Sequence, residues 1–144
     1  MKPPSSPMTD EGIASRQISA REAQLARAQA VAHIGSWHLD IATGELEWSE
    51  ETCRIFGVSP GSRMTYDDFL SALHPEDREK VDAAWQRAMQ GHPYDLEHRI
   101  VVAGKVKWLR ELAELEFTVD GKLCAGVGTV QDITARKEAE IALA

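Results

Sequence analysis

The feature that most constrains the fold is a change in the spacing of apolar residues just after Gly91. Before this point apolar residues recur about every three or four positions, as in helices, and after it they alternate every two, as in strands. The strand candidates are residues 94–102, 105–118 and 122–133. They are joined at Ala103-Gly104 and Asp120-Gly121, so we expect three consecutive antiparallel strands.

Two more strands are expected before the helical region. Residues 37–41 and 45–48 are rich in apolar and aromatic side chains, and the short Ala42-Thr43-Gly44 segment between them is typical of a β-hairpin. Ser49 then favours the start of a helix, and further helices are expected as far as Gly91. The order of two strands, several helices and three strands predicts an α+β fold.

The N-terminal end is expected to hold a leader and one helix. Residues 1–17 contain three prolines and many small polar residues without apolar periodicity, which predicts a disordered leader. Residues 18–33 predict an amphipathic helix whose apolar stripe is narrow: Ile18, Leu25 and Ala32. Such a stripe buries little surface by itself, so we expect it to dock on a sheet or on a second copy.

The C-terminal end is expected to hold the start of a helix. Thr134 is placed to cap a helix, and residues 134–144 are interpreted as the start of a linker helix that leads into an absent output domain. Asp132, Ile133 and Thr134 would then fix the angle at which this helix leaves the last strand. The alternative is that Asp132 and Thr134 only cap the helix and add about 1 kcal/mol of stability.

Composition narrows the classes of function. The chain has 144 residues, enough for one domain, and a formal net charge of -7. This charge argues against binding to nucleic acid or to an anionic membrane, and no segment has the length of a membrane span or the pattern of a secretory signal. We expect a cytoplasmic protein. The two cysteines, Cys53 and Cys124, are expected to be reduced thiols.

Several segments resemble a PAS domain of the PAS-fold-3 type. They are GSWHLDIATGELEWSEETCRIFGVSP, TYDDFLSALHPEDREKV, YDLEHRIVVAGKVKW and GTVQDITARKEAE. The resemblance runs from about Ile34 to Glu140 and sets the domain at residues 34–133. It implies a five-stranded antiparallel sheet with helices on one face, around a cavity that can hold a small ligand or cofactor. It also implies a sensory or dimerisation module that controls an attached histidine kinase, diguanylate cyclase or similar output. Asp132-Ile133-Thr134 matches the family's junction between last strand and exit helix, and we predict that these residues form the signal relay.

Strand register predicts which residues share each face of the sheet. If both turns are centres of symmetric hairpins, Leu96 lies opposite Glu111, and Glu111 lies opposite Val130. The face that contains them is largely apolar and is the predicted pocket wall: Leu96, His98, Ile100, Glu111, Ala113, Leu115, Phe117, Cys124, Gly126, Gly128 and Val130. His98 and Glu111 are the expected polar contacts inside a pocket, although each side chain could instead be satisfied within the protein.

The opposite face of the sheet also carries apolar side chains and therefore invites a partner. We predict a homodimer through this face and the N-terminal helix. The residues expected in the interface are Ile18, Leu25, Ala32, Trp108, Leu112 and Val127.

One turn departs from the family pattern. Where relatives commonly have Asp-Gly, this chain has Ala103-Gly104, which leaves the turn type open because Ala resists positive φ.

The signatures of cofactor-bearing relatives are not matched. Light-sensing flavin relatives carry Asn-Cys-Arg-Phe on a mid-domain helix, whereas this chain has Thr52-Cys53-Arg54-Ile55 on an earlier one. Haem relatives place a ligating His within the long helix before the third strand, and residues 76–90 contain no His. We therefore predict no cofactor and disfavour flavin and haem, while an unidentified small molecule stays open. No pattern typical of a metal site or of catalysis occurs, so the segment is not expected to be an enzyme.

The sequence supports two functions that it does not separate. The first is a sensory module that binds a small ligand or partner and passes a signal to an output domain. The alternative is a purely structural interaction domain in which Trp48, Phe69 and Phe117 fill the cavity. A packed core and a small pocket use the same kinds of residue, so the sequence leaves both open.

Overall fold

The computed structural model describes residues 9–144. Its elements are α1 (Asp10–Ala32), β1 (Ile34–Asp40), β2 (Glu45–Trp48), α2 (Glu50–Phe56), β3 (Met64–Thr65), α3 (Tyr66–Ala72), the short 3-10 helix η1 (Pro75–Asp77), α4 (Arg78–Met89), β4 (Tyr94–Val102), β5 (Lys105–Phe117), β6 (Leu123–Asp132) and α5 (Thr134–Leu143). This order confirms the α+β class, with helices inserted between an early hairpin and three late strands.

All strands within residues 9–144 belong to one antiparallel sheet, in the order β3-β2-β1-β6-β5-β4. The sheet has six strands rather than the expected five, because the two-residue β3 pairs with β2 at one edge. The first long strand, β1, pairs with the last, β6, along its whole length. This pairing brings the two ends of the domain together at the centre of the sheet.

The predicted register is confirmed over most of the three late strands. Leu96 pairs with Glu111, and Glu111 pairs with Val130. The register shifts at a bulge between Glu116 and Phe117. Phe117 therefore pairs with Leu123, whereas a symmetric hairpin would pair it with Cys124. A bulge adds one residue to one strand, and the side-chain alternation predicted beyond it is lost.

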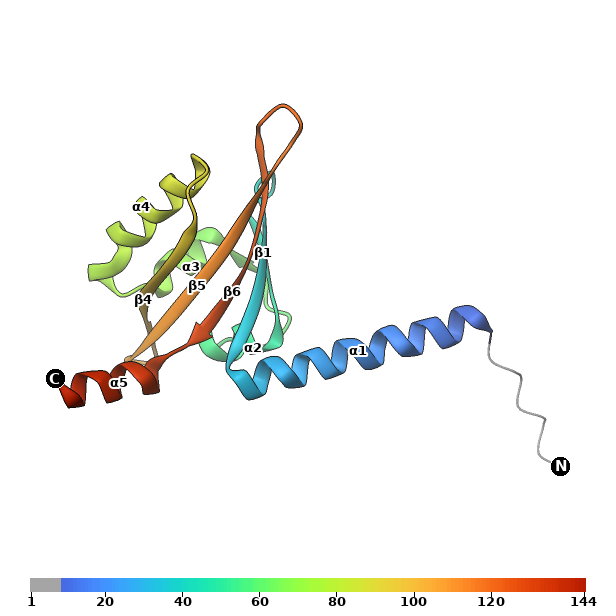
Figure 1. The fold of residues 1–144 in the computed structure, drawn as a ribbon, viewed down its shortest axis with the longest axis horizontal. Coiled ribbons are helices and arrows are strands. Elements are labelled where there is room, and N and C mark those ends of the chain that lie inside the picture. The colour runs from blue at the N-terminus through green and yellow to red at the C-terminus, as the bar shows by residue number, and fades with distance from the viewer. Residues whose placement is uncertain (1–8) are drawn as a thin grey trace.

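Helices α3 and α4 lie on one side of the sheet, which is called the inner face below (Figure 1). The core fills the space between them and includes Leu73, Val81, Ile100, Leu109 and Val130, each at most 1 % exposed. Full burial of one such side chain contributes about 1.5–3 kcal/mol, so this layer supplies much of the stability.

Helix α1 projects away from the sheet and has no buried residue (Figure 1). It begins at Asp10, where Thr9 accepts a hydrogen bond from the Gly12 amide. The expected leader at residues 1–17 is therefore wrong for residues 10–17, which are helical, and residues 1–8 lie outside the described part. Local capping extended the helix upstream, although this turn carries little apolar periodicity.

The β4–β5 turn resolves the open question of turn type. Ala103 has φ 51° and Gly104 has φ 78°, so both central residues are left-handed, as a type I′ turn requires. The twist of the strands outweighs the cost of about 1 kcal/mol that Ala bears in this conformation.

Across residues 9–144, no helix combines the length and apolar character needed to cross a bilayer.

Candidate functional site

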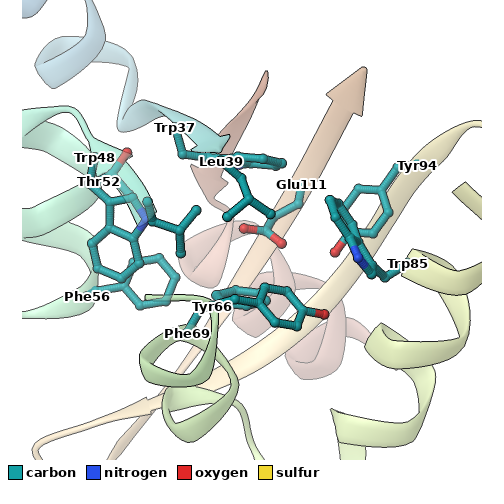
Figure 2. A pocket seen from close by; sticks show the side chains of 11 residues that line it. Trp37, Leu39, Trp48, Thr52, Phe56, Tyr66, Phe69, Trp85, Tyr94 and Glu111 are labelled. Atoms are coloured by element: carbon teal, nitrogen blue, oxygen red, sulfur yellow. The ribbon is translucent and has the colours of Figure 1, made fainter. Parts of the chain in front are cut away.

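A cavity of about 30 Å³ lies between the inner face of the sheet and helices α2, α3 and α4 (Figure 2). It has space for about one to two water molecules. Its lining residues come from strands and helices far apart in the sequence: Trp37, Leu39, Leu46, Trp48, Thr52, Phe56, Tyr66, Phe69, Trp85, Tyr94 and Glu111. The cavity is therefore a product of tertiary packing.

Aromatic rings form most of the walls. Trp48 at the end of β2 packs on Phe56 at the end of α2, with ring centroids 4.5 Å apart. On the opposite side Trp85 of α4 meets the edge of Tyr94, with centroids 5.7 Å apart and an interplanar angle of 86°. Such pairs contribute about 0.5–1.5 kcal/mol each beyond area burial, so the walls are held in place by their own contacts.

A carboxylate, Glu111, reaches into this aromatic space from β5 (Figure 2). Its Oε2 lies 3.0 Å from Nε2 of His98, and both residues are buried. The other ring nitrogen of His98, Nδ1, lies 3.4 Å from the carbonyl oxygen of Arg99. Because both nitrogens face acceptors, the doubly protonated imidazolium fits this site and neutralises Glu111.

The shift of the His98 pKa agrees with this geometry. Burial lowers the pKa of His98, but the charge and the hydrogen bond of Glu111 outweigh burial and raise the pKa above its ordinary value. The phenols near Glu111 are held neutral. Burial, followed by the charges of Asp82 and Glu111, raises the pKa of Tyr66 to about 12. Burial and Glu111 raise the pKa of Tyr94 further.

Two polar atoms at the cavity lack a partner. Trp37 and Tyr66 both line the cavity, and within residues 9–144 nothing forms a hydrogen bond with the buried Nε1 of Trp37 or the buried hydroxyl of Tyr66. A buried donor without a partner costs about 1–3 kcal/mol, and most such atoms in proteins are satisfied by protein, water or ligand. A molecule in the cavity that reaches either atom would satisfy it.

Of the residues predicted to form the pocket wall, Glu111 alone lies among the cavity-lining residues. Ile100, Val130 and His98 are buried in the same layer, and the side chains of Leu96, Ala113 and Leu115 pack against the core. Phe117 and Cys124 are exposed at the bulge, where Phe117 pairs with Leu123 and Cys124 is left unpaired, so the structure does not place them at the cavity.

Gly126 and Gly128, two glycines of the predicted pocket wall, leave room for the Trp37 side chain. A Cβ on Gly128 would lie 2.6 Å from the Trp37 ring, and one on Gly126 would lie 3.6 Å from it. The indole of Trp37 thus covers β6, and the open space lies beyond that ring. Sequence reasoning missed the aromatic residues that line it, except Trp48 and Phe69, which it considered as cavity fillers. The aromatic side chains at the starts and ends of the helices were the sequence signal that could have predicted these cavity walls.

The outer face of the sheet contacts α5. The Trp108 ring lies 5.3 Å from the Arg99 guanidinium and 5.1 Å from Nζ of Lys137 on α5. Lys137 also pairs with Glu97 at 2.7 Å, and Arg136 contacts the same carboxylate. Strand β4 and helix α5 are therefore linked through charged and aromatic groups.

The β6–α5 junction differs in detail from the expected cap. Thr134 is the first residue of α5, and its hydroxyl accepts a hydrogen bond from the Trp108 amide at 3.0 Å. Asp132 accepts from the Thr134 amide at 3.0 Å. Ile133 is buried, and its amide donates to the Trp108 carbonyl at 2.9 Å. The predicted capping by Thr134 is wrong, because its hydroxyl is engaged by β5, and Asp132 serves the helix start instead.

The residues predicted for a dimer interface are largely exposed. Ile18 and Leu25 on α1 are 57 % and 60 % exposed, and Leu112 and Val127 on the outer face are also exposed. Trp108 is half-buried because α5 covers part of it.

Among residues 9–144 no group of three or more His, Cys, Asp or Glu side chains is placed to hold a metal ion.

Comparison with known proteins decides the family. The family model described as PAS fold matches residues 45–130. The chain belongs to the PAS family. It is 37% identical over 111 residues to a blue-light-activated histidine kinase of Brucella ovis, and 33% identical over 112 residues to the sensor protein FixL of Bradyrhizobium diazoefficiens. Each match covers 76% of this chain and 22% of the relative, so the PAS domain spans about a fifth of these proteins.

Solved structures agree with this assignment. A sensory box histidine kinase/response regulator from Burkholderia thailandensis superposes with a TM-score of 0.71 at 26% identity, covering 83% of this chain and 92% of that one. The PAS domain described above is thus a sensory module.

The prediction that disfavoured flavin and haem is wrong. It relied on two short motifs, whereas the similarity to a blue-light-activated kinase and to FixL extends over most of the domain. A light-oxygen-voltage domain studied with a flavin analogue also shares the fold, with a TM-score of 0.61 at 11% identity. Flavin and haem therefore stay among the ligands to consider. Either group needs several hundred Å³, so binding one here requires the aromatic walls to move apart.

Proposed function

We propose that this PAS domain binds a small ligand in the aromatic cavity and relays its presence to an output domain beyond α5, such as a histidine kinase or a diguanylate cyclase. The observation that carries the proposal is the combination, in one cavity, of a buried carboxylate with two buried polar atoms that lack partners. A core that only supports the fold gains nothing from unpartnered polar atoms. In this proposal the domain itself catalyses nothing.

Contacts between adjacent groups offer a route from cavity to exit helix. Glu111 holds His98, whose ring faces the carbonyl of Arg99. The Arg99 side chain is fixed by Asp77 at 2.7 Å and lies against Trp108, which contacts Lys137 of α5. A ligand that moves Glu111 would change the position of Arg99 and with it the support of α5. Spatial continuity alone does not establish coupling, so the route requires a direct test.

Hydrogen exchange of α5 amides provides this test. Glu111→Gln removes the charge that holds His98 and should speed exchange at the start of α5 and at the Trp108 amide, which is bonded to Thr134. Glu114→Gln on the same strand, where the side chain is exposed, is the matched control and should leave that exchange unchanged. Equal exchange in both variants would contradict the relay.

Ligand binding is tested separately by mass. Native mass spectrometry of freshly purified protein should show mass above that of the denatured chain. A native mass equal to the denatured mass, together with no response to any added small molecule, would favour the alternative of a purely structural interaction domain. The small volume of the cavity, about 30 Å³, is the observation that favours this structural alternative.

We also propose a homodimer in which α1 and the outer sheet face bury their exposed apolar side chains. Replacing both Ile18 and Leu25 by Ser should produce monomers, as should deletion of residues 1–32, because the apolar stripe of α1 would be lost. Gln24→Ser, also exposed on α1, is the control. Light scattering that finds an unchanged dimer in both altered proteins would remove α1 from the interface.

A further inference from the structure

The chemistry of the cavity narrows the class of ligand, an inference that rests on the proposed function. Glu111, Trp37 and Tyr66 set the hydrogen-bonding requirements of the cavity. The other two hydroxyls at its walls have partners, because Thr52 donates to the Ser36 carbonyl and Tyr94 interacts with Glu111. Glu111 offers carboxylate oxygens, which only accept when ionised, and one of them is occupied by His98. Trp37 offers an N–H that only donates, and the Tyr66 hydroxyl both donates and accepts. A complementary ligand needs at least one acceptor and one donor.

The charge balance of the cavity favours an uncharged ligand. Glu111 and His98 already form a neutral pair at 3.0 Å, with both side chains almost completely buried. A ligand carboxylate would meet Glu111 in a space of low polarity, where like charges repel strongly. The raised pKa of Tyr66 has the same physical origin, since burial first and nearby carboxylates next oppose negative charge there.

A cation is also a poor match. It would face the aromatic walls favourably, but the His98 imidazolium lies next to the same carboxylate. An ammonium group has donors only, so it would leave the Trp37 N–H without an acceptor. An apolar molecule would leave the Trp37 N–H and the Tyr66 hydroxyl without partners.

The walls restrict the shape of the ligand. Trp48 and Phe56 stand on one side of Glu111, and Trp85 and Tyr94 stand on the other (Figure 2). Flat rings pack well against such walls in offset or edge-on contacts. The volume of about 30 Å³ leaves little space, so the ligand that needs the least movement of these walls is a compact one.

We infer that the cavity takes a compact, planar, uncharged molecule whose edge carries a hydrogen-bond donor next to an acceptor, as in a cyclic amide. The donor binds Glu111, and the acceptor receives a hydrogen bond from Tyr66 or Trp37. The walls move apart to admit the ring, because the unligated space of about 30 Å³ is smaller than one six-membered ring.

Four one-ring probes test this class: 2-pyridone, benzoate, benzylammonium and benzene. Binding is followed by the indole N–H signal of Trp37 in nitrogen–proton NMR spectra, assigned with Trp37→Phe. The Trp108 indole, on the outer face, is the internal control. We expect 2-pyridone to shift the Trp37 signal and to bind at least about tenfold more tightly than benzoate or benzylammonium. Benzoate or benzylammonium binding as tightly as 2-pyridone would overturn the ligand class while leaving the cavity a binding site. If none of the four probes shifts the Trp37 signal, the ligand class is overturned, whereas the ligand-binding function itself is decided by the native mass.

Tyr66→Phe separates a binding role from a structural one. The change removes a buried hydroxyl that has no partner within the described chain, so the unligated protein should be as stable as before or more stable. Binding of 2-pyridone should weaken by about two- to tenfold, the effect of one lost hydrogen bond. A less stable unligated variant that binds 2-pyridone with unchanged affinity would contradict the assignment.

Discussion

Adjacent residues of β4 place ion pairs of similar chemistry on opposite faces of the sheet. His98 faces inward, is fully buried and pairs with Glu111, whereas the side chain of Glu97 faces outward, is 32 % exposed and pairs with Lys137 and Arg136 of α5. Water screens the outer pairs, so they form and break at little cost, while the inner pair has no solvent to replace a lost partner. The outer face is therefore suited to holding a helix reversibly, and the inner face to a fixed site.

The largest effect should come from breaking the inner pair. His98→Ala leaves the Glu111 carboxylate buried without its cation, and we expect the free energy of unfolding to fall by about 3–5 kcal/mol. Glu97→Ala, one residue away on the outer face, should cost about 1 kcal/mol or less. Urea denaturation of both variants gives the comparison. Similar losses would show that burial does not distinguish the two faces energetically.

Packing on the inner face predicts a smaller loss. Gly128→Ala places a Cβ 2.6 Å from the Trp37 ring and 2.2 Å from the Leu112 carbonyl oxygen, and overpacking of this kind costs about 1–3 kcal/mol. Gly126→Ala is the matched control on the same strand, because its Cβ would lie 3.2 Å from a flexible Leu115 methyl. Thermal unfolding should rank Gly128→Ala as the less stable variant. The reverse order would place the Trp37 ring elsewhere.

The two faces should also respond to pH in opposite directions. The pKa of His98 is raised above 6.5, so its contribution to stability is complete below that pH and is lost as pH rises through the folded-state pKa. The pKa of Glu97 is lowered from 4.5, chiefly by its hydrogen bond with Lys137, so its contribution is present above that pH and is lost as pH falls.

Denaturation measured from about pH 3 to about pH 9 checks both signs. His98→Gln should remove the alkaline loss and keep the acid loss. An alkaline loss that persists in this variant would have to come from another group.

The smallest expected change lies in the β4–β5 turn, which belongs to neither face. Ala103→Gly removes the penalty of a left-handed alanine, with φ 51°, and should stabilise the protein by about 0.5–1 kcal/mol. The higher entropy of Gly in the unfolded chain opposes this gain. Urea denaturation would contradict the expectation if the variant were less stable, and exchange of α5 should stay unchanged.

The sequence predicts the late strands well because hairpins are local. Alternation and two short turns are enough to pair Leu96 with Glu111 and Glu111 with Val130. The prediction failed at Phe117 and Cys124, because Cys124 is an extra residue that shifts the pairing by one position there, and an alternating pattern does not reveal such a bulge. The helix start at Asp10 was also missed. The side chain of Thr9 caps the helix there, and this cap does not need an apolar stripe in the first turns.

The sequence by itself determined the fold class, the register near the β4–β5 turn and the inward placement of His98 and Glu111, because backbone pairing and side-chain alternation act between near neighbours. Tertiary structure alone decided where the cavity lies. The Trp37 ring covers Gly126 and Gly128, and Tyr66 joins the walls from a distant helix. The size and polarity of a cavity depend on how side chains from separate elements fill a shared volume, which no local pattern encodes.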